Sequence, residues 1–136
     1  MLWERAASEW PFADGEFDVI VSFYAFEHMY PFAPVLANLR RLLAPRGVLA
    51  GAIPCEGGLA WGAGRMLTSR RWFLRHTHID PDKIICWEHP NFADALLNDL
   101  SASFGPAALA WWPWRVPSLD LNLIVSFVFE RDESLP

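Results

Sequence analysis

The sequence predicts an α/β fold with parallel strands, and two apolar runs on either side of a helical pattern carry this prediction. Residues 17–23 (FDVIVSF) are rich in β-branched side chains and do not alternate with polar ones, which is typical of a strand buried on both faces. Residues 47–53 (GVLAGAI) have the same character. A strand, a helix and a second strand joined by tight turns form a βαβ unit, so we expect the two strands to be parallel.

The helix of this unit is predicted from apolar residues that recur on one stripe. The members of the stripe are Val35, Leu36, Leu39, Leu42 and Leu43. The segment 44–47 (APRG) follows, and its proline and glycine end the helix.

The second half of the chain is predicted to be helical and then extended. Ser69 is expected to cap a short helix that runs through Arg75, and residues 80–82 (DPD) are expected to form a turn. Asn91 is expected to cap a further helix. The predicted buried stripe of that helix is Phe92, Ala95, Leu96 and Leu100. Residues 107–115 and 120–130 are predicted to form an antiparallel strand pair.

Composition narrows the possible functions. The chain has 136 residues, 53% of them apolar, so it can bury the core of one domain. Its net charge of −5 argues against a general nucleic-acid-binding protein, which needs a basic surface. Its longest uncharged stretch contains two prolines and is shorter than the ~20 residues of a membrane-spanning helix. The chain has two cysteines, and the single disulfide that they could form would not stabilise a domain of this size. We therefore expect a reduced, cytoplasmic setting.

Three motifs in order resemble class I S-adenosylmethionine-dependent methyltransferases, and most closely their type 11 small-molecule group. They are residues 10–22 (WPFADGEFDVIVS), residues 26–28 (FEH) and residues 41–47 (RLLAPRG). The resemblance covers roughly residues 6–54 and implies methyl transfer from S-adenosylmethionine to a small molecule. It also implies a Rossmann-like sheet flanked by helices, with a terminal antiparallel strand pair.

The sequence departs from this family at its beginning. The first two to three strands have no counterpart, and neither does the glycine-rich loop (GxGxG) that cradles the cofactor in the family. We therefore expect one incomplete, truncated domain. Its expected parts are a βαβ core (1–54), a variable acceptor-side helical region (55–106) and a terminal strand pair (107–136).

The missing strands suggest an alternative function. Without its neighbour, the strand at 17–23 becomes a sheet edge with free backbone donors and acceptors. The chain is then a non-catalytic remnant or a partner-binding module that associates through this edge, either with itself or with a missing N-terminal half.

The resemblance also implies site residues. Ser22, Phe23 and Tyr24 are expected to border the methionine part of the cofactor, and Ala7 and Ser8, with Glu9, its adenine side. A ligand at the carboxyl end of a parallel strand agrees with the general rule for open α/β sheets.

Polar residues farther along the chain are candidates for acid–base and acceptor contacts. His28 is expected to act as a general base, because imidazole titrates near neutral pH; the alternative is a histidine bonded to the backbone at a helix start. Glu56 and His89 are expected to bind the acceptor, although Glu56 can also be read as a solvated loop acid. His76 and His78 lack a third ligand, so no metal site is predicted.

Two further groups have both a functional and a structural interpretation. A basic stretch surrounds Trp72 and Phe73, and it either binds a substrate phosphate or carboxylate or is a charged helix face. Its members are Arg65, Arg70, Arg71 and Arg75. The tryptophans at 111, 112 and 114 line an acceptor pocket, rest on a membrane, or cover the core as hairpin residues.

Overall fold

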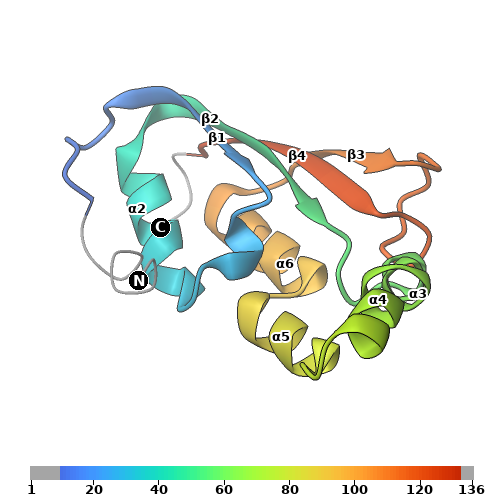
Figure 1. The fold of residues 1–136 in the computed structure, drawn as a ribbon. Coiled ribbons are helices and arrows are strands. Elements are labelled where there is room, and N and C mark those ends of the chain that lie inside the picture. Colours follow the sequence, from blue (N-terminus) through green and yellow to red (C-terminus); the bar gives the residue numbers. More distant parts are fainter. Residues whose placement is uncertain (1–9, 133–136) are drawn as a thin grey trace.

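The computed structural model describes residues 10–132, which form a four-stranded mixed sheet with helices (Figure 1). The elements in chain order are β1 (Phe17–Phe23), η1 (Phe26–His28), α2 (Phe32–Leu42), β2 (Leu43–Pro54), α3 (Leu59–Leu67), α4 (Ser69–His76), α5 (Pro81–Glu88), α6 (Ala93–Phe104), β3 (Ala108–Trp112) and β4 (Ile124–Glu130). The prediction of an α/β fold is confirmed.

The sheet has the strand order β1-β2-β4-β3. β1 and β2 are parallel, and α2 connects them, as the βαβ prediction requires. β4 pairs antiparallel with both β2 and β3, so the predicted terminal strand pair is also present. Within the described part of the chain, β1 pairs with β2 alone and is therefore an edge strand.

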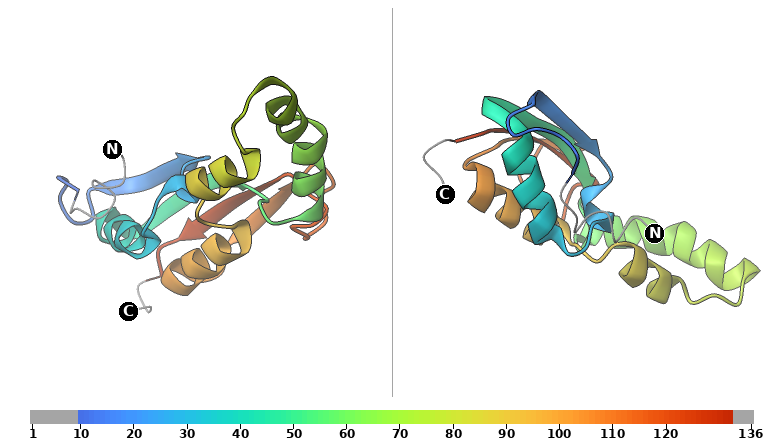
Figure 2. Two further views of the ribbon diagram at one scale, coloured as in Figure 1. Left: turned by 60° about the horizontal axis from the view of Figure 1, so that its bottom comes forward. Right: turned by 90° about the vertical axis from the view of Figure 1, so that its left-hand side faces the viewer.

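The core lies between the sheet and the two helices α2 and α6, which cover one face of it (Figures 1 and 2). The buried side chains of α6 recur at helical spacing, and Phe104 at its end packs against Phe129 of β4 with ring centroids 6.1 Å apart. Phe127, two residues earlier on the same strand face, stacks on Phe26 of η1. These aromatic contacts fix η1 against the sheet.

The opposite face of the sheet carries no helix of the described chain. On β1 the side chains of Val19, Val21 and Phe23 are exposed, while Ile20 between them packs against the core. The prediction that this strand is buried on both faces is therefore wrong for these residues. The reason is that alternate strand residues point to opposite faces and only one face is covered.

Several predicted boundaries differ in the structure. β2 begins at Leu43 and not at residue 47, and residues 81–88 form helix α5, where only a turn was expected. Asp80 caps this helix through its side chain and Pro81 occupies its first turn, because an Asp-Pro pair suits a helix start as well as a turn.

Two predicted caps are wrong, as is half of a predicted stripe. Thr68 and Phe92 precede α4 and α6, so neither Ser69 nor Asn91 is a cap. Phe92 and Ala95 are exposed. Leu96 and Leu100 are buried as predicted, and they share their stripe with Ala93 and Phe104.

The helices α3, α4 and α5 form an arm that projects from the end of the sheet (Figure 2). We call residues 59–88 the helical arm. α3 and α4 contain no buried residue, and Pro81 is the buried residue of α5. Between residues 10 and 132, no helix is long and apolar enough to cross a bilayer.

Candidate active site

Polar side chains gather where β1 and β2 end, which is where ligands bind in open α/β sheets. Glu27 and His28 lie in η1, directly after β1, and Glu56 lies two residues after β2. His89 follows α5 and completes the group. His28, Glu56 and His89, which are far apart in the sequence, come together in the fold.

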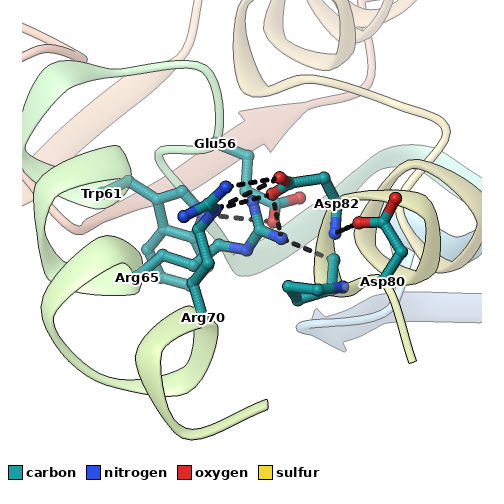
Figure 3. Close-up of polar contacts among 7 residues, drawn as sticks. Glu56, Trp61, Arg65, Arg70, Asp80 and Asp82 are labelled. Atoms are coloured by element: carbon teal, nitrogen blue, oxygen red, sulfur yellow. Dashed lines mark hydrogen bonds and ion pairs between the residues drawn. The ribbon is translucent and has the colours of Figure 1, made fainter. Parts of the chain in front are cut away.

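Glu56 and His89 form a hydrogen-bonded pair. The Nδ1 atom of His89 lies 2.6 Å from Oε2 of Glu56. The other carboxylate oxygen, Oε1, accepts a hydrogen bond of 3.1 Å from the indole nitrogen of Trp61 (Figure 3). Glu56 is only 4% exposed, so it is not a solvated loop acid. Its charge is instead held in place by two donors, as a buried carboxylate requires.

His28 lies against His89, with the two rings edge to face and their centroids 4.3 Å apart. Its Nδ1 lies 2.7 Å from the carbonyl oxygen of Glu88, and a carbonyl only accepts, so Nδ1 carries the proton. The expected backbone bond is therefore present, but it reaches a residue 60 positions away and not the local helix. With Nδ1 donating in both rings, each neutral imidazole has its lone pair on Nε2.

Glu27 is a buried acid within the motif at residues 26–28, and no role was predicted for it. It is 2% exposed, and its Oε2 has no hydrogen-bond partner in the described structure. Burial raises the pKa of Glu27, while a backbone hydrogen bond and, after it, the neighbouring His28 and His89 oppose that rise. Glu27 is therefore electrostatically coupled to both imidazoles.

Asn91 holds the two sides of the site together. Its side-chain amide nitrogen donates to the carbonyl of Phe26 at 2.9 Å and to that of Met29 at 2.7 Å. These carbonyls flank Glu27 and His28 in the chain. Asn91 therefore ties η1 to the segment that carries His89, which is a positioning role.

A pocket of about 360 Å³ is lined by Glu56 of this pair, and His89 is not among its lining residues. Its lining combines carboxylates, an aromatic ring and close-packed backbone. The lining residues are Glu56, Gly57, Gly58, Phe92, Asp94, Leu119 and Asp120. Gly58 is required there, because a Cβ would come within 2.2 Å of the carbonyl oxygen of Leu119. The pocket lies beside the end of β2.

The residues expected at the cofactor lie on the edge strand. Ser22 is half-buried, whereas Phe23 and Tyr24 are exposed. Ala7, Ser8 and Glu9 lie outside the described residues. Of the residues expected at the cofactor, only Ser22, Phe23 and Tyr24 lie in the described chain, and they would border S-adenosylmethionine there.

The remaining candidates are placed elsewhere. Trp112 and Trp114 are exposed in the β3–β4 region, and Trp111 is half-buried against the core. His76 stacks on Trp72 within the arm. Among residues 10–132, no group of three or more His, Cys, Asp or Glu side chains is arranged to bind a metal ion.

Comparisons with known proteins agree with this fold. A family model described as a methyltransferase domain matches residues 3–51. The fold is similar to that of a solved structure, the selenomethionine-substituted CurJ carbon methyltransferase, with a TM-score of 0.54 and 17% sequence identity. The similarity covers 90% of this chain and 31% of the other, so this chain spans about a third of that protein. No curated protein sequence matches.

The family match falls on the segment that contains the motifs, and the structural match extends the likeness over the four-stranded sheet. The resemblance predicted from the motifs is therefore confirmed over residues 3–51, which match the methyltransferase-domain model, and the structural match confirms the fold.

Proposed function

We propose that this chain is the C-terminal, acceptor-side part of an S-adenosylmethionine-dependent methyltransferase that acts on a small molecule. The observation that carries the proposal is the buried Glu56 carboxylate, which lines a pocket and is hydrogen-bonded to His89. A histidine whose Nδ1 is held by a carboxylate presents Nε2 as a proton acceptor. The acidic net charge of the chain favours a small molecule over a nucleic acid as acceptor.

The chemistry divides between cofactor and protein. The sulfonium of S-adenosylmethionine supplies the methyl group, and an acceptor oxygen, nitrogen or carbon that gains it must lose a proton. His89 takes this proton on Nε2, and Glu56 stabilises the resulting imidazolium through the hydrogen bond at Nδ1. The pocket residues orient the acceptor, because methyl transfer depends mainly on an in-line approach.

His28 is the other candidate for the base. Its ring lies against that of His89, and its Nδ1 is held by a backbone carbonyl and not by a carboxylate. A carboxylate stabilises an imidazolium more strongly than a neutral carbonyl does. We therefore propose His89 as the base and His28 as a second contact to the acceptor.

The uncovered face of the sheet supports the proposal that a further half of the domain holds most of the cofactor. Val21 and Phe23 are both 63% exposed on the edge strand β1. Exposure of large apolar side chains along an unpaired edge is unfavourable for an isolated domain. A strand and helices packed there would cover both the edge and the face.

Calorimetric titration tests this proposal. S-adenosylmethionine is titrated into this chain and into a version extended at its N-terminus by a strand, glycine-loop and helix half of a type 11 methyltransferase. We expect no binding to the chain alone and micromolar binding to the extended protein, whose cooperative thermal unfolding shows that it is folded. Micromolar binding to the chain alone contradicts the missing half, and a folded extended protein that does not bind contradicts the methyltransferase proposal.

The exposed edge also favours the second candidate function, a module that associates through β1. Light scattering during size exclusion distinguishes the two states of the chain. We expect Val21→Lys to shift an associated form towards monomer, because a lysine on an edge strand opposes pairing. The control Val116→Lys changes an equally apolar, exposed residue outside the sheet. A wild-type chain that is monomeric at all concentrations excludes self-association.

A further inference from the structure

The helical arm exposes an unusual amount of apolar surface for its length. Large apolar side chains on all three of its helices and on the connections between them are more than half exposed. They are Leu59, Met66, Leu67, Trp72, Leu74, Ile79 and Trp87. Soluble domains rarely expose apolar side chains so densely unless the surface binds something.

Ion pairs nonetheless connect the three helices of the arm. The carboxylate of Asp82 in α5 is 3.1 Å from the guanidinium of Arg65 in α3 and 3.1 Å from that of Arg70 in α4 (Figure 3). Arg65 also donates to the carbonyl of Pro81 at 2.6 Å. The hydrogen bond from Arg70 lowers the pKa of Asp82. One acidic side chain thus joins the three helices.

The charge of the arm is opposite to that of the rest of the chain. Residues 59–88 contain five Arg and Lys against three Asp and Glu, a net charge of +2 in a chain of net charge −5. Asp82 is engaged by Arg65 and Arg70. Arg71 and Arg75, one helical turn apart on α4, are exposed. The free cationic groups of the arm therefore face solvent close to Trp72.

Exposed tryptophan and leucine beside arginine is the composition of helices that lie in a membrane interface. The aromatic and aliphatic groups enter the acyl boundary, while the guanidinium groups remain at the anionic headgroups. None of the three helices is longer than nine residues, so they can lie on a bilayer but cannot cross it. We propose that the helical arm is a peripheral binding surface for a bilayer that contains anionic lipid.

The helical arm is connected to the candidate active site. α3 begins shortly after Glu56, and its Trp61 donates a hydrogen bond to that carboxylate. The base of the arm is therefore attached to the candidate active site. A bilayer bound to the arm lies beside the site.

Co-sedimentation with vesicles tests the proposal on the whole chain and does not depend on methyltransferase activity. We expect binding to mixed phosphatidylserine and phosphatidylcholine vesicles, weak binding to pure phosphatidylcholine, and a decrease as salt is added. The double variant Arg71→Glu, Arg75→Glu is expected to weaken binding about tenfold or more, since each basic residue near the surface contributes to attraction. Trp72→Ala is expected to weaken binding at low and high salt alike.

A matched control lies in the β3–β4 loop, where Trp114 and Arg115 are also exposed. The variant Trp114→Ala, Arg115→Glu removes the same kinds of side chain and is expected to bind vesicles like the wild type. If this control variant no longer binds vesicles, the membrane contact lies in the β3–β4 loop and the proposal is wrong. Absence of binding to anionic vesicles, or equal binding to both vesicle types, also overturns it. Unchanged thermal unfolding of each variant excludes loss of fold as the cause.

Discussion

Glu56 and His89 are 33 positions apart in the chain, yet the carboxylate of one and the imidazole of the other are joined by a hydrogen bond of 2.6 Å. The pair connects the end of β2 to the segment after α5. It is therefore a structural link as well as the candidate acid–base pair, and the two roles predict different measurements.

The structural role predicts a loss of stability in Glu56→Gln. The amide keeps one acceptor oxygen and cannot accept from both His89 and Trp61, so we expect a loss of about 1–3 kcal/mol in the free energy of unfolding. Urea denaturation measures it. Asp99→Asn, an exposed acid on α6, is the control and is expected to change little. Equal stability of Glu56→Gln and wild type contradicts the link.

The acid–base role predicts a loss of rate when His89 is replaced. In the extended, cofactor-binding protein, His89→Asn is expected to lower kcat by about 10²–10⁴, the usual contribution of a general base. His28→Asn is expected to raise KM for the acceptor more than it lowers kcat. The kinetic constants of the two variants are compared across pH. The reverse ranking of the two histidines assigns the base to His28.

Glu27 predicts a pH dependence of stability. Because burial raises its pKa above the ordinary value of 4.5, the folded chain binds this proton more tightly than the unfolded chain does. Its contribution to stability is therefore present at low pH and is lost as the pH rises from about 4.5 through the raised pKa.

Replacing Glu27 removes that dependence. Glu27→Gln is expected to gain stability relative to wild type between acidic and neutral pH, by about 1.4 kcal/mol for each unit of the pKa rise. Thermal unfolding at a series of pH values measures the difference, with Asp99→Asn as a matched exposed control. A constant difference across pH shows that Glu27 is not perturbed.

Two glycines predict opposite effects of the same substitution. A Cβ at Gly51 of β2 would come within 2.0 Å of the carbonyl oxygen of Ser22 and 2.8 Å of the Phe127 ring, so Gly51→Ala is expected to destabilise the chain by about 1–3 kcal/mol or more. Gly64 of α3 has open space around it, so Gly64→Ala is expected to stabilise its helix by up to about 1 kcal/mol. Chemical denaturation of both variants checks the ranking, and equal effects contradict the packing of β1 on β2.

The strands and the two core helices could be predicted because their signals are local. Residues 17–23 and the stripe through Leu39 carry the periodicity of their elements. Helix α5 was not predicted, because an Asp-Pro pair such as Asp80-Pro81 can begin either a turn or a helix. Few side chains of α5 are buried, so its sequence also shows no periodic apolar stripe. The exposed face of β1 could not be read from its composition, since an apolar run looks alike whether one face or both are covered.

The site was predicted as separate residues and not as an arrangement. His28, Glu56 and His89 each stand near a predicted strand or helix end, which is a local signal. Their contacts join segments 33 and 60 residues apart, and no local pattern specifies such pairings. Asn91 was expected to cap α6, and its actual bonds to two carbonyls of another segment belong to the same class of long-range contact.

The bonds of Asn91 also decide how the two imidazoles can vary. The Asn91 side chain donates to main-chain carbonyls on both sides of His28, so these bonds position η1 without a contact between the two imidazole rings. A polar replacement at position 28 therefore leaves the anchoring of η1 in place, whereas a replacement at position 89 also removes the bond to Glu56. The two histidines of the site therefore differ in how far the fold depends on them.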